Sequence, residues 1–216
     1  MKAYVITILD NPDSVKASEA CMESFKRNNP GLEIAQWEAK TPDKDDIYEI
    51  ARAQSIPVSK FEEVYSRFDR CLAAFLSHYS IWDFVANHTK ENTLIFEHDA
   101  YVTNKIPRIH FNSIINLGKP SYGKFNIPSM GVGPMMSKAY LPGAHAYAIS
   151  PKGAKNLVKL AKTEAGPTDI FINNIRFPSL QEYYPWPAEC RDTFTTIQQE
   201  AGCLAKHNYG DDYGII

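Results

Sequence analysis

Thr93-Leu94-Ile95-Phe96-Glu97-His98-Asp99-Ala100 is the stretch that decides the predicted fold, because an apolar run stops there at two carboxylates around a histidine. β-branched and aromatic residues at 93–96 predict a buried strand, so the charges lie at its carboxyl end. In an open α/β sheet, ligands bind at that end. Carboxylate oxygens suit Mg²⁺ or Mn²⁺, and an ion held by Glu97 and Asp99 would neutralise a diphosphate.

The composition is that of an ordinary globular protein. With 216 residues, 44% of them hydrophobic, the chain can bury one sizeable core. The 23 basic and 25 acidic residues give a formal charge of -2, so nucleic acid is an unlikely partner. The apolar run in residues 1–9 is too short for a membrane span and lacks a cleavage site, so we expect a cytoplasmic protein without a span.

The cysteines favour reduced thiols rather than a disulfide framework. They contain no CxxC pair and no metal-ligand spacing. The four are Cys21, Cys71, Cys190 and Cys203.

The start of the chain predicts a parallel β-α-β unit. A first strand lies within residues 1–9, Ser14 is expected to cap the helix that follows, and residues 32–37 alternate as a second strand does. No Gly-x-Gly-x-x-Gly loop is present, which disfavours a dinucleotide-binding dehydrogenase.

The remaining pattern predicts further helices and strands. Short covering helices are expected within 41–68, and a stronger helix over 70–87 carries His78 on its apolar face. Strands are expected at 111–117 and 145–149. Ser150 and Pro151 then begin a helix that runs through Lys162.

A long glycine-rich segment, residues 118–143, is predicted to be a mobile lid or binding loop. It holds five of the chain's 11 glycines together with four prolines. A disordered excursion is the structural alternative. Beyond Phe177 we expect an aromatic, proline-rich wrap over the core, so that residues 1–201 form one domain and 202–216 a flexible tail.

Three blocks in the right order are similar to glycosyltransferase family 25, which includes bacterial lipooligosaccharide and collagen galactosyltransferases. The first is the helix 71–82 with Ser77-His78, and the second is 94–100, where the family has Glu-Asp-Asp-Ala. The third is Gly143-Ala144-His145-Ala146-Tyr147, continuing to Lys155 and followed by Pro167-Thr168-Asp169.

This resemblance implies a GT-A type fold, a single α/β domain with a mostly parallel, Rossmann-like sheet flanked by helices. It implies a hexosyltransferase that moves galactose or glucose from a UDP-sugar with inversion, aided by Mn²⁺ or Mg²⁺. The acceptor would be a glycan, a lipid-linked molecule as in lipopolysaccharide biosynthesis, or a protein. The implied roles are metal binding by Asp99 and Glu97, general base catalysis by Asp169, and donor binding by Thr7, Leu9, Ser77, His78, Glu97 and His145.

Two departures keep alternatives open. His98 replaces the middle acid of the triplet, and residues 10–13 lack the arginine that commonly follows the family's first strand. A catalytically inactive, glycosyltransferase-like binding protein is therefore one alternative. A nucleotidyltransferase is disfavoured, because residues 9–12 lack a Gly-rich loop with a basic residue. At residue level, His78 is expected to be mainly structural, and Asp169 has a competing role as a helix cap.

Overall fold

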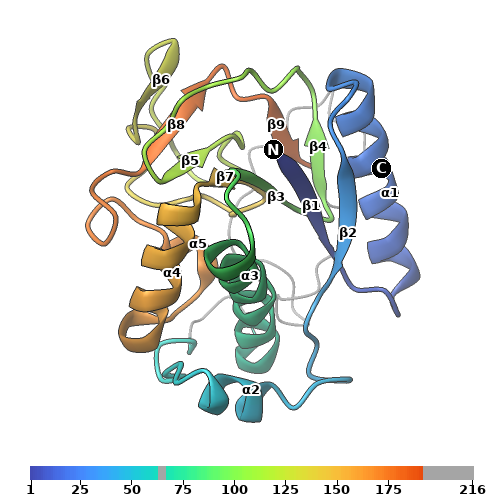
Figure 1. Cartoon of the computed structure of the whole chain (residues 1–216), viewed down its shortest axis with the longest axis vertical. Coiled ribbons are helices and arrows are strands. Elements are labelled where there is room, and N and C mark those ends of the chain that lie inside the picture. The colour runs from blue at the N-terminus through green and yellow to red at the C-terminus, as the bar shows by residue number, and fades with distance from the viewer. Residues whose placement is uncertain (63–66, 192–216) are drawn as a thin grey trace.

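Strand β1 lies inside a seven-stranded sheet, between β2 on one side and β3 on the other (Figure 1). The computed structural model describes residues 1–62 and 67–191. Along the chain the elements are β1 (Lys2–Thr7), α1 (Pro12–Asn28), β2 (Ile34–Glu38), α2 (Ile47–Ala53), α3 (Phe68–His88), β3 (Thr93–Glu97), β4 (Ala100–Val102), β5 (Ile114–Asn116), β6 (Gly131–Pro134), β7 (Ala146–Ile149), α4 (Pro151–Glu164), α5 (Thr168–Phe171), β8 (Gln181–Tyr184) and β9 (Ala188–Cys190).

The sheet has the order β2-β1-β3-β7-β5-β8-β6. The pairings of β1, β2, β3, β5 and β8 make them run in one direction, and β7 and β6 run against them. The expected α/β fold with a mostly parallel sheet and flanking helices is confirmed. The chain moves from β1 to β2 and then back across β1 to β3, and such a reversal opens a crevice at the carboxyl ends of the strands.

Two apolar clusters pack against the two faces of the sheet. On the face covered by α3 and α4, Trp82 and Tyr147 are fully buried beside Ile95. On the face covered by α1, the rings of Phe25 and Phe96 meet edge to face at 5.6 Å. Because Ile95 and Phe96 face opposite sides, β3 is buried on both faces, as its uninterrupted apolar run predicts.

The strongest helix patterns gave correct predictions. Residues 70–87 lie within α3, and α4 begins after Ser150, whose hydroxyl accepts a hydrogen bond from the Gly153 amide at 3.1 Å. The expected parallel β-α-β opening is also present. Within the described residues, Cys21, Cys71 and Cys190 are buried and form no disulfide with one another, and no helix is long and apolar enough to cross a membrane. Cys203 lies outside the described residues.

The predicted cap of α1 is wrong. Asn11 is the N-cap, and its side chain accepts from the amides of Asp13 and Ser14. The Ser14 hydroxyl turns away from the helix and accepts from the Ile8 amide at 2.9 Å. Ser14 therefore fastens the turn between β1 and α1 instead of capping the helix.

Short strands account for the other differences. Residues 118–143 contain β6, which pairs with β8, and the expected wrap beyond Phe177 contains β8 and β9. The expected strand at 111–117 is reduced to β5. Of the short covering helices expected within 41–68, α2 is present. Part of the remaining stretch, residues 63–66, lies outside the described residues, and so does the expected tail 202–216.

Candidate active site at the carboxyl edge of the sheet

A directed chain of hydrogen bonds leads from the core to Glu97, the last residue of β3. The Trp82 indole donates to the Tyr147 hydroxyl at 2.8 Å, so that hydroxyl turns its own proton to His78 Nδ1, also at 2.8 Å. His78 Nε2 then carries the proton and donates to Glu97 Oε1 at 2.9 Å. Glu97 is thereby held in one orientation by a fully packed core.

His78 is neutral in this arrangement. Burial lowers its pKa from 6.5 to about 3, although the negative charge of Asp169 opposes that shift. The buried, fully hydrogen-bonded ring agrees with the expected structural role, and it also gives His78 direct contact with a candidate metal ligand. Sequence reasoning placed His78 on the apolar face, and its partners come from β7 and β3.

Asp99 lies beyond the end of β3 and contacts β9. Its Oδ2 accepts from the Cys190 thiol at 2.9 Å, and its Oδ1 is buried without a hydrogen-bond partner among the described residues. A buried carboxylate oxygen without a partner is costly, and a cation or a ligand would satisfy it. Asp99 therefore fits the donor set of a divalent ion.

The described residues contain no group of three His, Cys, Asp or Glu side chains that could hold a metal ion together. The predicted pair of Glu97 and Asp99 remains a prediction. Two carboxylates leave most coordination positions of Mn²⁺ or Mg²⁺ to other oxygens. Such an ion would need the phosphate oxygens of a bound nucleotide and water to complete its shell.

His145 occupies a slot made by two glycines. A Cβ on Gly118 would lie 2.4 Å from His145 Nε2, and one on Gly143 would lie 3.1 Å from Nδ1. Both ring nitrogens are buried without a partner in the described part of the chain. Burial lowers the His145 pKa to about 4, against the opposing charge of Asp99. The ring lies near the candidate metal site but is 2% exposed, so direct donor contact would require the slot to open.

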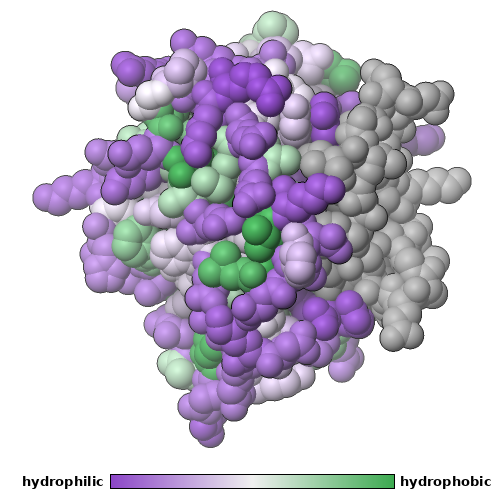
Figure 2. Space-filling model, turned by 90° about the vertical axis from the view of Figure 1, so that its right-hand side faces the viewer, coloured by the Kyte–Doolittle hydropathy of each residue, from purple (hydrophilic) through white to green (hydrophobic). Residues whose placement is uncertain are grey.

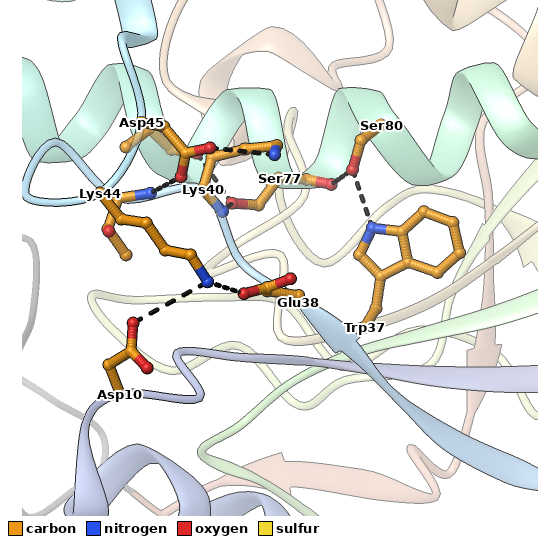
Figure 3. Close-up of polar contacts among 10 residues, drawn as sticks. Asp10, Trp37, Glu38, Lys40, Lys44, Asp45, Ser77 and Ser80 are labelled. Atoms are coloured by element: carbon orange, nitrogen blue, oxygen red, sulfur yellow. Dashed lines mark hydrogen bonds and ion pairs between the residues drawn. The ribbon is translucent and has the colours of Figure 1, made fainter.

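The other predicted donor contacts differ in accessibility. The buried Thr7 hydroxyl donates to the Val5 carbonyl, and Ser77 Oγ donates to the Ala73 carbonyl while accepting from the Lys40 amide at 2.8 Å. Ser77 therefore ties the loop after β2 to α3 (Figure 3). Leu9 is 44% exposed at the end of β1 and can meet a ligand.

Lysines missed by the sequence reasoning lie on the loop after β2. Lys44 contacts Glu38 and lies 3.9 Å from Asp10, while Lys40 donates to Asp45 at 3.0 Å (Figure 3). The loop continues from β2 at the carboxyl edge, where the Ala39 amide donates to the Thr7 carbonyl. Each ammonium group is paired with a carboxylate, so this loop carries charges of both signs beside the edge that holds Glu97 and Asp99.

His98 contacts the beginning of α1. Ser14 Oγ, which accepts from the Ile8 amide, also shares a hydrogen bond with His98 Nδ1 at 3.0 Å. The imidazole thus supports the β1–α1 turn from the neighbouring strand. Its position between the two carboxylates is evident in the sequence, but its contact with Ser14, 84 residues away, is not.

Asp169 is held by Tyr122, a contact that the sequence did not reveal. The Tyr122 hydroxyl donates to Asp169 Oδ2 at 2.6 Å, and burial together with this carboxylate raises the pKa of Tyr122. Lys138 lies over the rings of Tyr122 and Tyr140, which stack at 6.3 Å. Pro167, not Asp169, is the N-cap of α5 and makes no side-chain cap. Asp169 lies in the first turn, where its Oδ1 accepts from the Ile170 amide at 2.9 Å, so part of the expected structural role is present.

Two acids on the C-terminal strands, Glu182 on β8 and Glu189 on β9, already have partners. The structure buries Glu182, and its Oε1 accepts from the amides of Met136 and Ser137 at 2.6 and 2.8 Å. Glu182 thus anchors the segment that follows β6. Glu189 forms an ion pair with Arg191 at 2.7 Å.

Comparison with known proteins finds likeness to solved structures only. No family model and no curated protein matches the chain. The crystal structure of the glycosyltransferase GlyE from Streptococcus pneumoniae TIGR4 is 13% identical, with a TM-score of 0.44, over 85% of this chain and 45% of that chain. The crystal structure of the apo form of GlyE is 16% identical, with a TM-score of 0.37, over 76% of this chain and 39% of that chain. The chain spans less than half of those proteins, and so low a likeness does not identify a shared function.

Proposed function

We propose that the protein is a glycosyltransferase that moves a hexose, galactose or glucose, from a UDP-sugar to an acceptor hydroxyl with inversion and with help from a divalent ion. One observation carries the proposal. Two carboxylates, Glu97 as the last residue of β3 and Asp99 just after it, lie at the point where the strand order reverses around β1. That crevice is where open α/β sheets bind nucleotides, and the resemblance of residues 71–82, 94–100 and 143–155 to family 25 supports a sugar nucleotide as the ligand.

Three features of the edge suit a diphosphate. The N-terminus of α1 faces the same edge, directly after β1, and favours negative charge. Lys40 and Lys44 lie after β2, and each ammonium group would have to exchange its present carboxylate partner for a phosphate oxygen. Asp99 and Glu97 would hold a Mn²⁺ or Mg²⁺ ion, which when bound would stabilise the charge that develops on the leaving diphosphate.

Protein groups would supply the remaining chemistry. Asp169 would accept the proton of the acceptor hydroxyl, with Tyr122 fixing one of its oxygens. His78 would keep Glu97 in position without changing its own charge, since its pKa lies near 3. Residues 118–143 would close over the donor as a lid and exclude water, with the β6 end held by Glu182.

UDP release from UDP-galactose and UDP-glucose tests the proposal. The parent protein with Mn²⁺ should release UDP slowly without an acceptor, and EDTA should stop the reaction. Glu97→Gln and Asp99→Asn should each lower the rate by about 10²-fold. Glu23→Gln, an exposed acid on α1, is the matched control and should keep the parental rate. A parent that binds a UDP-sugar yet releases no UDP is the result expected of the inactive binding protein.

A further inference from the structure

The charge of the chain is strongly segregated along the sequence. From Ala100 to Thr163 there is no acidic residue, and all 25 Asp and Glu residues lie outside this range. The same range holds nine basic residues: Lys105, Arg108, Lys119, Lys124, Lys138, Lys152, Lys155, Lys159 and Lys162. A chain with a net charge of -2 therefore has a strongly positive middle segment.

Four of these lysines form one face of α4, which we call the basic face: Lys152, Lys155, Lys159 and Lys162. Their spacing of three, four and three residues places them along one side of the helix. All four are exposed, whereas the opposite side buries Ala154, Leu157 and Ala161 in the core. Glu164, the acid at the end of α4, pairs with Lys60 and Arg176, and within the described residues none of the four lysines forms an ion pair.

An apolar, uncharged segment lies in the same half of the molecule as α4 in the view of Figure 1. Residues 125–137, here the apolar hairpin, contain no charged residue and include β6, the edge strand of the sheet. Ile127, Met130 and Met136 are 65%, 75% and 60% exposed. Figure 1 shows β6 at the upper left and α4 below it on the left, with β8 and β5 between them.

The opposite side of the molecule has a different character. Figure 2 shows the side that carries α1 and β2, which is largely hydrophilic. On α1, basic residues alternate with acids, since Asp13, Glu19 and Glu23 accompany Lys16 and Lys26. Mixed signs make an ordinary solvated surface, whereas the basic face has one sign only.

We propose that the basic face and the apolar hairpin together dock the protein on an anionic lipid surface. The lysines would meet the phosphates of the headgroups, and Ile127, Met130 and Met136 would enter the boundary with the acyl chains. Nucleic acid would match the lysines but gives exposed apolar side chains no apolar environment. The inference deepens the proposed function, because it assigns the acceptor to molecules carried on such a surface.

Vesicle co-sedimentation tests the inference without using catalysis. The parent protein should bind vesicles of phosphatidylcholine mixed with phosphatidylglycerol and should not bind phosphatidylcholine alone. High salt should weaken this binding, because the lysine contribution is electrostatic. Since each lysine near an anionic surface contributes roughly fivefold to affinity, Lys→Gln at all four positions of the basic face should reduce binding by at least about tenfold.

A matched variant separates the basic face from total charge. Lys2, Lys16, Lys26 and Lys90 are exposed lysines on other elements, and changing them together to Gln removes the same charge. This control should bind vesicles as the parent does. Gln forms helix about as well as Lys, so both variants should fold, and circular dichroism checks this. Met130→Gln should weaken binding in both low and high salt, because its contribution is apolar.

Three results would overturn the inference. They are a parent that does not bind anionic vesicles, equal loss of binding in the two lysine variants, and preferential binding of a duplex DNA through the basic face. The UDP-release assay is run in parallel without lipid. Vesicle binding without UDP release would contradict the proposed function alone, and UDP release without vesicle binding would contradict the docking surface alone.

Discussion

At the scale of residues, the contact between Tyr122 and Asp169 separates catalysis from structure. Asp169→Asn keeps an oxygen that accepts the Tyr122 proton but removes the carboxylate that would take the proton of the acceptor. We therefore expect transfer to fall by about 10²-fold or more, with little change in melting temperature. Acceptor-dependent UDP release and thermal unfolding measure the two quantities.

Asp83→Asn on α3 serves as the control and should keep the parental rate. If Asp169→Asn also keeps it, Asp169 is not the base. Glu182 would be a poor replacement, since it is buried and already accepts two amides.

The sequence identified charged residues better than it identified their partners. Glu97, Asp99 and Asp169 were found because acids end an apolar run or match a motif. Tyr122 and Cys190 were not found, because they approach these acids from 47 and 91 residues away. Such contacts depend on tertiary packing, which a local pattern does not contain.

At the scale of elements, Gly153 determines how closely α4 approaches Ser113, the residue directly before β5. A Cβ at Gly153 would lie 2.1 Å from the Ser113 carbonyl oxygen, which belongs to the backbone and cannot turn away. Alanine normally stabilises a helix relative to glycine, but here we expect Gly153→Ala to destabilise the fold by about 1–3 kcal/mol. Urea denaturation measures the change.

Gly133→Ala is the comparison, because a Cβ at Gly133 would have no atom within 4 Å. It should change the free energy of unfolding by less than Gly153→Ala. A Gly153→Ala protein as stable as the parent would show that α4 does not approach Ser113 this closely.

Element length explains which parts of the fold were predicted. The 21-residue α3 and the 14-residue α4 carry several turns of periodic pattern, and the buried β3 and β7 carry uninterrupted apolar runs. Strands β4 and β9 have three residues each, too few to show alternation, and they form through pairing with each other. Asn11 and Ser14 are both residue types that cap helices. Because the Ser14 hydroxyl accepts from the Ile8 amide, Asn11 is the residue that caps α1.

At the scale of the whole molecule, two buried histidines should make stability depend on pH. Both pKa values are lowered from 6.5 in the folded protein, to about 3 for His78 and about 4 for His145. The unfolded chain therefore takes up protons first as the pH falls below 6.5. The free energy of unfolding should decrease between pH 6.5 and 4 by up to about 1.4 kcal/mol per pH unit for each histidine.

Denaturant unfolding at a series of pH values tests this dependence. His110→Asn, at an exposed position, should leave the profile unchanged, and His145→Asn should flatten it. Equal stability of the parent at pH 7 and pH 5 would show that these rings are not held neutral by burial.

The most direct test of the central claim is calorimetric binding of UDP with and without Mn²⁺. Asp99 has a buried oxygen without a partner in the described part of the chain, so an ion there should bind weakly alone and more tightly with a diphosphate. We predict that Mn²⁺ increases UDP affinity in the parent and in Glu23→Gln, and that Asp99→Asn abolishes the increase. A parent protein whose UDP affinity is the same with and without Mn²⁺ would contradict the metal-assisted site.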